Sequence, residues 1–423
     1  MRILHVIDHA PPRTSAYSRR IMAILRQQRA LGWQTCHLTS GRTQHANELT
    51  SNSSKWHFYR TPAARGTLGR LPLIGAVNVL AQRLDQVVQL TRPDLLHAHS
   101  PVVNALAALR VGRRHGLPVV FEAHAPSASS PPGSVWSDSA ARRRGAVAGE
   151  ALARFGMRAL EAWAAARAGA VITNSEGMQL RLRHGGIPQR KITLVPDALD
   201  LRNYVALAPA GQRAPANALV DDASTEAQGA VLIGVAASGQ HLEVMLAALA
   251  LLRRTSSGAA LLVSCAPEQF DMVRQAVARH GLDGHVDLLA SPAGASKSER
   301  MPRRLPDLHR LADVLVFPEA ARHLAATPSR KLLEAMAHGC LVIAADTPIN
   351  RSVIEHGRSG LLFAEDDAEA LAGAISVALA RRGRWPSLRA AARWFIEYHR
   401  TWDICAARYG PVYEKLLAGR RRR

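Results

Sequence analysis

Two cations and a carboxylate stand together at the start of a predicted helix towards the end of the chain. Arg330 and Lys331 fall on its first turn, and Glu334 follows one turn later on the same face as Lys331. The first backbone N–H groups of a helix have no intrahelical partner, so this end favours an anion such as phosphate. A neighbouring carboxylate can accept hydrogen bonds from hydroxyls, and a phosphate beside a vicinal diol describes a nucleotide. A simple surface pair of Lys331 and Glu334 on an amphipathic helix also fits these residues.

The surrounding residues predict the elements that position this group. Thr327 is predicted as the helix N-cap and Pro328 as the first helical residue, while Gly339 is predicted to end the helix in a left-handed conformation. The apolar run 340–345 that follows is typical of a strand buried on both faces of a parallel sheet. The helix start should therefore lie at the edge of such a sheet.

A turn of small residues earlier in the same half of the chain predicts a second phosphate contact. This turn lies between a predicted strand over 230–236 and a helical pattern over 242–254, and small residues there would admit a phosphate to the helix start. The candidate residues for this phosphate-bearing ligand, which we call the donor-binding residues, are Arg330, Lys331, Glu334, Ser238 and Gly239.

Histidines mark the ends of two predicted strands in the first half of the chain. His97 and His99 lie at the end of the strand 95–98, and His124 follows the strand 118–122. The carboxyl ends of parallel strands meet at one edge of a sheet, where such side chains can act as general acid or base or bind a sugar or phosphate. We take His124 as the candidate catalytic residue, whereas His97, which continues an apolar strand, is more simply explained as a core residue.

The first strand and helix predict another part of the same edge. The run 2–8 predicts a strand and 17–31 a helix, so the loop between them should face a substrate cleft. The loop lacks the GxGxxG pattern of dinucleotide-binding enzymes. We call this side of the cleft the acceptor side, and its candidate residues are Ser15, Tyr17, His99 and Ser175.

Strands and helices alternate along the whole chain, which predicts the α/β class with two doubly wound, Rossmann-like domains. A chain of 423 residues is too long for one core. We predict a first domain over 1–205, an Ala- and Pro-rich linker over 206–228 and a second domain over 229–386. A helical segment over 387–423, interrupted near Gly410, is predicted to fold back on the first domain.

The net charge of +21 comes mainly from arginine and bears on partners and location. Nucleic-acid binding is disfavoured, because aromatic residues make up 5% of the chain and no zinc finger, RNP-like strand or basic zipper occurs. Attachment to an anionic membrane surface is favoured, although codon bias towards arginine would give the same excess.

Four well-separated cysteines indicate neither a zinc site nor disulfides. Without a signal peptide or an apolar run of about 18 residues, we expect a cytoplasmic protein, peripheral on the inner membrane face.

Several motifs resemble those of the retaining glycosyltransferases of family 4, which have the GT-B arrangement of two Rossmann-like domains facing a cleft. The resemblance extends over nearly the full length of the chain. In detail, the chain is similar to the branch of this family that is associated with exosortase systems and exopolysaccharide assembly. It rests on HVIDHAPPRTSAYSRRIMAILRQQRALGW, VITNSEGMQLRLRHGGI, KITLVPDALDL, LLEAMAHGCLVIAADTP and TWDICAARYGPVY.

This resemblance implies roles for three of the candidate residues. Glu334 would bind the nucleotide ribose, Lys331 would lie near the diphosphate and His124 would contact the transferred sugar. The implied reaction moves a hexose from a nucleoside diphosphate sugar to a glycan or polyprenyl-linked glycan hydroxyl with retention. The leaving phosphate would receive the acceptor proton, so neither a cofactor nor a metal is implied.

The chain departs from the family pattern at three donor-site positions. Ala326 stands where the family has a second glutamate, and the family's arginine and lysine fall at Val235 and Gln240. Loss of two cations would remove about 1.5 to 3 kcal/mol of diphosphate stabilisation for each charged hydrogen bond. Two hypotheses follow. The protein is either an active enzyme in which Arg330 and Lys331 replace the lost pair, or a degenerate binding subunit of a polysaccharide assembly complex.

Overall fold

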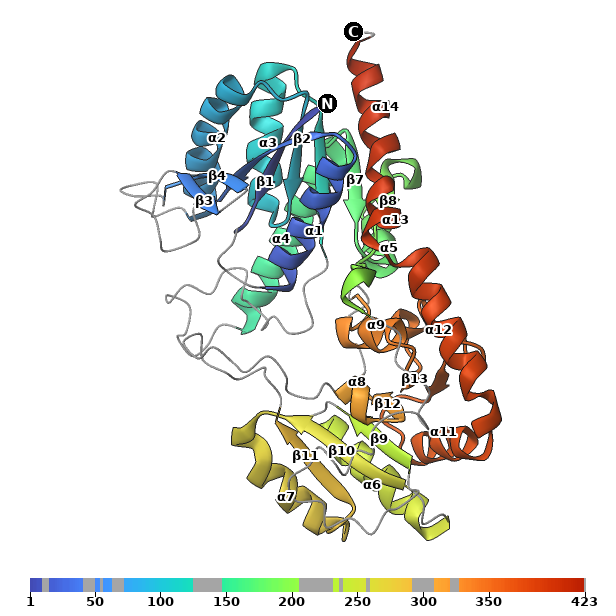
Figure 1. Ribbon diagram of the computed structural model, residues 1–423. Helices are drawn as coiled ribbons and strands as arrows, with labels where there is room; N and C mark the ends of the chain where they lie inside the picture. The colour runs from blue at the N-terminus through green and yellow to red at the C-terminus, as the bar shows by residue number, and fades with distance from the viewer. Residues whose placement is uncertain are drawn as a thin grey trace. The chain divides into compact units, whose positions relative to one another are not determined.

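Two compact units of the chain are seen in the computed structural model (Figure 1). Unit 1 is built mainly from Met1–Asp197 and Trp402–Arg423, and unit 2 mainly from Ala198–Arg322 and Pro328–Thr401. The structure describes residues 1–9, 15–40, 50–53, 56–62, 72–124, 147–204, 231–235, 239–255, 259–290, 308–319 and 327–421.

Unit 1 contains an eight-stranded sheet with the order β3-β4-β2-β1-β5-β6-β7-β8. All neighbouring strands are parallel except β3 and β4. The strands are β1 Arg2–Ile7, β2 Gln34–Thr39, β3 Thr50–Ser53, β4 Trp56–Arg60, β5 Leu95–His99, β6 Val119–Ala123, β7 Ala170–Thr173 and β8 Ile192–Leu194. The helices between them are α1 Ala16–Ala30, α2 Pro72–Thr91, α3 Val102–His115, α4 Val147–Arg167 and α5 Glu176–His184.

Unit 2 contains a six-stranded, wholly parallel sheet with the order β11-β10-β9-β12-β13-β14. The strands are β9 Val231–Val235, β10 Ala259–Cys265, β11 Val286–Ala290, β12 Val314–Phe317, β13 Leu341–Ala345 and β14 Leu361–Phe363. The helices are α6 Gln240–Thr255, α7 Phe270–Arg279, α8 Leu308–Leu311, α9 Arg330–Ala337, α10 Pro348–Arg351, α11 Ala368–Ala380 and α12 Trp385–His399. Two doubly wound sheets confirm the predicted α/β class with Rossmann-like domains.

Strand β13 shows why the apolar run at 340–345 predicted a doubly covered strand. Leu341, Ile343 and Ala345 belong to the apolar cluster on one face of the sheet, and Val342 and Ala344 belong to the cluster on the other. All five are buried. Because alternate side chains of a strand point to opposite faces, both faces need apolar residues.

Helix α9 begins later than the sequence predicted. Ser329, whose ψ of 131° is not helical, is the N-cap, and the helix starts at Arg330 rather than at Pro328. Its buried face begins with Leu332, and Pro328 is buried in the non-helical segment that precedes the helix. The predicted end is confirmed, because Gly339 has a φ of 72°, in the left-handed region that glycine adopts without strain.

The C-terminal helical segment is interrupted at a different place from the one predicted. Helix α12 ends before Arg400, where the N–H of Leu199 donates to the Arg400 carbonyl at 2.8 Å. Two further helices follow, α13 Trp402–Ala407 and α14 Tyr409–Arg421. The Gly410-Pro411 pair lies in the first turn of α14, where proline's missing N–H removes no intrahelical hydrogen bond.

The last three helices divide between the two units. Helix α12 packs on α9 within unit 2, whereas α13 packs on α1 within unit 1. Leu416 of α14 lies against Gly169, at the start of β7. The chain therefore returns to unit 1 at Trp402, after the position 387 at which the predicted segment begins.

Candidate functional site

The first candidate group lies at the start of α9 in unit 2. Oε1 of Glu334 accepts hydrogen bonds from Nε of Arg330 at 2.7 Å and from the phenol of Tyr204 at 2.8 Å. Nη2 of Arg330 also donates to the Tyr204 oxygen at 3.0 Å. Burial and the Glu334 carboxylate raise the pKa of Tyr204 to about 12, so the phenol keeps its proton. In the described part of the chain, Oε2 of Glu334 accepts no hydrogen bond and is left for another donor.

The helix start beside this carboxylate can bind an anion. The Ser329 side chain makes no capping hydrogen bond, so it leaves the first-turn N–H groups of α9 available to a ligand. Lys331 is exposed and forms no ion pair with a described residue. Arg330 instead pairs with Glu334, whereas the surface-pair alternative placed Lys331 in that pair, and Lys331 has no ion-pair partner among the described residues.

The remaining donor-side candidates are placed only in part. Gly239 has a φ of 58° and directly precedes α6, where its carbonyl accepts from the N–H of Leu242 at 3.1 Å. Val235 is fully buried at the end of β9, and Gln240 is the first residue of α6. Ser238 and Ala326 lie outside the described residues.

The second candidate group surrounds Glu122, a fully buried residue of β6 in unit 1. Its Oε1 accepts from Nη2 of Arg20 at 2.8 Å, from Nε of Arg20 at 3.1 Å and from Nε2 of His124 at 2.9 Å. Its Oε2 accepts from the phenol of Tyr409 at 2.8 Å. A carboxylate from the sheet is thus held by α1, by the residue after β6 and by the C-terminal helix α14.

Electrostatics keep this carboxylate ionised. Burial acts to raise the pKa of Glu122, but Arg20, followed by His99 and the hydrogen bonds from His124 and His97, holds that pKa well below its usual range. Arg20 is only 5% exposed and remains charged. Its Nη1 also donates to Oδ1 of Asp197 at 2.7 Å.

Behind Glu122, a chain of hydrogen bonds connects β1, β5, α1 and α14. Nδ1 of His5 lies 3.0 Å from Nε2 of His99, and Nε2 of His5 lies 2.8 Å from Oε1 of Gln28. The Gln28 amide donates to the phenol of Tyr413 at 3.0 Å, and that phenol lies 2.7 Å from Nδ1 of His97. All five side chains are fully buried, and burial lowers the pKa of each of the three imidazoles.

The acceptor-side candidates fall into two kinds. His99 and Tyr17 lie next to His124, with ring centroids 5.8 and 5.6 Å from its imidazole. Ser15 and Ser175 instead cap helices, because their hydroxyls accept from the N–H groups of the residues three positions on in α1 and α5. The structure therefore brings together His124, His99 and Tyr17 and gives the two serines a structural contact.

Two buried groups have the spacing of metal ligands. They are His5 with His97 and His99, and His99 with Glu122 and His124, whose ligand atoms lie within 4.8 Å of one another. Most of these atoms already face protein partners, and the Arg20 guanidinium beside Glu122 opposes a divalent cation. Each of these residues takes part in the hydrogen-bond network, while Nε2 of His97 and Nδ1 of His99 make no hydrogen bond in the described chain.

Sequence reasoning missed the centre of the unit 1 group. One signal was available: Glu122 and His124 are two residues apart, so they point to the same side of an extended strand. Another was that Tyr409 and Tyr413 are four apart and share one helix face. Arg20, one of many arginines in this chain, carried no such signal.

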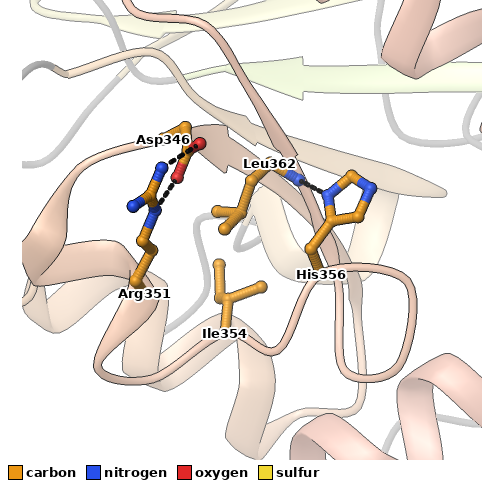
Figure 2. Close-up of a pocket in the computed structure, with 5 residues that line it drawn as sticks. All are labelled: Asp346, Arg351, Ile354, His356 and Leu362. Carbon is orange, nitrogen blue, oxygen red and sulfur yellow. Dashed lines mark hydrogen bonds and ion pairs between the residues drawn. The ribbon is translucent and has the colours of Figure 1, made fainter.

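A pocket of about 480 Å³ lies in unit 2 at the carboxyl end of β13 (Figure 2). Asp346 and Arg351 on its wall form a bidentate ion pair with distances of 2.5 and 2.7 Å. The N–H of Leu362 donates to Nδ1 of His356 at 3.0 Å, and Ile354 completes the lining (Figure 2). None of the donor-binding candidates that the structure describes lines this pocket.

The described part of the chain contains no helix with the length and apolar character needed to cross a membrane.

Solved structures show which class the two sheets define. The chain is similar to Alr3699/HepE of Anabaena in complex with UDP, with 16% identity, a TM-score of 0.67 and coverage of 98% of this chain and 100% of that one. It is also similar to the sucrose-phosphate synthase of Thermosynechococcus elongatus, with 16% identity, a TM-score of 0.65 and coverage of 99% and 100%. The fold is thus the GT-B type with two Rossmann-like domains, as predicted.

Family models then identify the chain. Residues 15–198 match the glycosyl transferase 4-like domain, and residues 229–381 match the glycosyl transferases group 1. Together these matches cover well over half of the chain, which belongs to this group 1 glycosyltransferase family.

A curated relative is the GDP-mannose-dependent alpha-(1-6)-phosphatidylinositol monomannoside mannosyltransferase of Mycobacterium tuberculosis. The two chains are 27% identical over 169 residues, which are 39% of this chain and 42% of the relative. The match thus spans less than half of the relative's length. The predicted glycosyltransferase family is confirmed, while the exosortase-associated branch and the retaining mechanism remain predictions.

Proposed function

We propose that this protein transfers a hexose from a nucleoside diphosphate sugar to a hydroxyl of a glycan or lipid-linked glycan, with retention, in the synthesis of exopolysaccharide or another envelope polysaccharide. The observation that carries this proposal is the start of α9, which holds exposed Lys331, uncapped N–H groups and the Glu334 carboxylate, whose Oε2 accepts no hydrogen bond from the described residues. Glu334 would accept hydrogen bonds from the ribose hydroxyls, while Lys331 and the N-terminus of α9 would bind the diphosphate.

The proposed chemistry is mainly electrostatic. As the anomeric C–O bond of the donor breaks, negative charge grows on the leaving phosphate, and Lys331 with the α9 N–H groups stabilises that charge. The acceptor hydroxyl forms the new glycosidic bond and its proton passes to the leaving phosphate. His124 would contact the transferred sugar. This scheme needs no resident metal or cofactor.

The relatives support a nucleotide sugar as donor. The mycobacterial relative is named as dependent on GDP-mannose, and structures of the Anabaena protein contain UDP, UDP with glucose, or UDP-glucose. A screen with UDP- and GDP-sugars would therefore begin with glucose and mannose. Binding raises apparent thermal stability by mass action, so a thermal-shift series can rank the donors.

Replacing Glu334 tests the donor site. Loss of charge-assisted hydrogen bonds in Glu334→Ala, at about 1.5 to 3 kcal/mol each, should weaken nucleoside diphosphate binding at least tenfold in calorimetry. Glu355→Ala is the matched control, because Glu355 is exposed and its carboxylate pairs with Arg358. Unchanged UDP and GDP affinity in Glu334→Ala would overturn the proposed donor site.

The degenerate-subunit alternative predicts a different result. The missing family glutamate at Ala326 and the missing cations at Val235 and Gln240 favour a protein that binds nucleotides weakly and transfers nothing. Transfer or donor hydrolysis by the wild-type protein that disappears in Lys331→Ala would exclude this alternative.

Attachment to an anionic membrane is proposed for one face of α4. Phe155 and Trp163, two turns apart on this helix, are 71% and 43% exposed. Arg158 and Arg167 lie exposed on the same helix, and the Arg167 guanidinium lies 4.0 Å from the centroid of the Trp163 ring. Exposed aromatic side chains beside arginines suit the interface of an anionic bilayer. This face would place the cytoplasmic protein on the inner membrane surface.

Vesicle flotation tests this attachment. We expect the protein to bind vesicles containing phosphatidylglycerol more than pure phosphatidylcholine. Phe155→Ser with Trp163→Ser should reduce binding at least tenfold, because each buried aromatic contributes about 1.5 to 3 kcal/mol. Trp394→Ser is the control, since Trp394 of α12 is 51% exposed but belongs to unit 2. Equal loss in both variants would contradict the assignment to α4.

A further inference from the structure

The orientation of the Gln28 amide fixes one set of directions for the hydrogen bonds behind Glu122. The Gln28 amide nitrogen donates to the phenol oxygen of Tyr413, so the Gln28 oxygen must accept from Nε2 of His5. His5 therefore carries its proton on Nε2. Its Nδ1 is an acceptor and takes the hydrogen bond from Nε2 of His99 at 3.0 Å.

The same logic fixes the direction on the other branch. The phenol oxygen of Tyr413 accepts from Gln28 and gives its own proton to Nδ1 of His97 at 2.7 Å. His97 then bears its proton on Nε2, which lies 3.1 Å from Oε2 of Glu122. The phenol of Tyr409 donates to this oxygen at 2.8 Å. Tyr409 therefore makes the hydrogen bond to Oε2 from the interior side, while Nε2 of His97 lies close to this oxygen without hydrogen-bond geometry.

His99 cannot supply a further hydrogen bond to the carboxylate. The neutral His99 ring carries its proton on Nε2, so its Nδ1 has a lone pair. Nδ1 lies 3.4 Å from Oε2 of Glu122 and has no hydrogen-bond partner in the described chain. The other oxygen, Oε1, is bound by Arg20 and by Nε2 of His124 at 2.9 Å. An ionised carboxylate only accepts, so His124 must carry its proton on Nε2.

We propose that Glu122 is a positioning residue for His124, selecting the Nε2-protonated tautomer so that Nδ1 serves as an acceptor for a hydroxyl of the transferred sugar. This inference rests on the proposed function, in which His124 contacts that sugar. Among the described residues, none donates a hydrogen bond to Nδ1 of His124. A ring nitrogen with a lone pair attracts a hydroxyl proton and repels a phosphate oxygen, so this atom suits the sugar rather than the diphosphate.

The surrounding charges favour this assignment over a metal ion between His99, Glu122 and His124. Arg20 carries one positive charge against the carboxylates of Glu122 and Asp197, both within 2.8 Å of its guanidinium nitrogens. A divalent cation would leave this buried group with net positive charge beside Arg20. The hydrogen-bonded arrangement instead keeps the guanidinium paired on both sides.

Nitrogen NMR of the full-length protein, labelled with nitrogen-15 in histidine and free of donor, tests the tautomer. The imidazole nitrogen shifts distinguish protonated from bare nitrogens, and the His124→Gln variant identifies the His124 signals by their absence. We expect one tautomer with the proton on Nε2. An Nδ1-protonated ring or a mixture overturns the proposal, as does a metal-bound ring whose signals change with EDTA.

Kinetics of two Glu122 variants add a functional measurement. Glu122→Gln keeps an oxygen acceptor for His124 and should retain the tautomer and most of kcat. Glu122→Met removes that acceptor and should lower kcat at least tenfold, while UDP or GDP affinity in calorimetry stays within twofold because Glu122 lies in unit 1. If Glu122→Met does not fold, the wild-type tautomer and the Glu122→Gln rates still decide the question. Equal loss of kcat in both variants would overturn the positioning role.

The two proposals fail in different ways. A His124 ring with the wrong tautomer overturns the positioning inference even in a protein that transfers sugar. Absence of transfer from every sugar nucleotide, with the Nε2 tautomer intact, counts against the proposed function instead.

Discussion

Replacing Arg20 by methionine is expected to lower the free energy of unfolding of unit 1 by about 3 to 5 kcal/mol. The guanidinium is 5% exposed and donates to Glu122, to Asp197 and to the Val195 carbonyl. Methionine retains the apolar stem but leaves the fully buried Glu122 carboxylate without its cation. An uncompensated charge in the interior costs far more than the loss of an exposed ion pair.

Urea unfolding followed by circular dichroism measures this effect. Arg19→Met is the matched control, because Arg19 is the exposed neighbour of Arg20 on α1. The double variant Arg20→Met with Glu122→Gln should recover part of the loss, since it removes the stranded charge together with its partner. A loss in Arg20→Met no larger than that in Arg19→Met would contradict a structural role for the ion pair.

Local patterns explain why the fold was predictable. The apolar run at 340–345 required a strand covered on both faces, and Gly339 supplied the left-handed residue that ends a helix. Both signals depend on residues close together in the sequence. The start of α9 was misplaced because Thr327 and Pro328 have suitable chemistry for a helix start, whereas burial of the helix face begins only at Leu332.

The network around Glu122 depends on contacts that no local pattern encodes. Tyr409 reaches the carboxylate across 287 residues of sequence, and Arg20 reaches it across 102. The histidines were visible at the strand ends, and in the structure the His99 and His124 rings lie 5.8 Å apart between centroids. The sequence could not show that α14 returns to unit 1 in the register that brings both tyrosines to these histidines.

The start of α9 contains a different ion pair from the Lys331–Glu334 surface pair that the sequence suggested. Arg330 forms the i,i+4 pair with Glu334 that a surface helix would have, and therefore is not a free cation for phosphate. Yet this pair, together with Tyr204, engages a single oxygen of Glu334 and fixes the orientation of the carboxylate. Tyr204 lies far from α9 in the sequence, so only the structure reveals that the proposed ribose acceptor is held in place from two sides.

Acidification from about pH 7.5 to about pH 5.5 is expected to destabilise unit 1 steeply. Burial is the largest cause that lowers the pKa of His5, His97 and His99 below the ordinary 6.5, and it lowers that of His37 to about 4. Below about pH 6.5 these imidazoles gain protons in the unfolded chain but stay neutral in the folded chain. The unfolded state then binds more protons, so the free energy of unfolding falls as the pH falls.

Each buried imidazole contributes at most about 1.4 kcal/mol per pH unit, so the four together give up to about 5 kcal/mol per unit. Glu122 acts in a lower range: its pKa is depressed in the folded chain, so its contribution is present above its ordinary value of 4.5 and is lost only as the pH falls further, through the depressed folded pKa. The loss between about pH 6.5 and 5.5 is therefore assigned to histidines rather than to carboxylates.

Urea titrations at several pH values test this assignment through one histidine at a time. His37 packs against Phe58 and Trp56, so His37→Phe keeps an aromatic ring in place while removing one group that titrates on unfolding. It should flatten the slope by about 1.4 kcal/mol per pH unit. Exposed His184→Gln on α5 is the control and should keep the steep fall. A free energy of unfolding that stays constant between about pH 7 and 5.5 would mean that the buried imidazoles gain protons in the folded protein over the same pH range as in the unfolded chain, contrary to the hydrogen-bond directions derived for His5, His97 and His99.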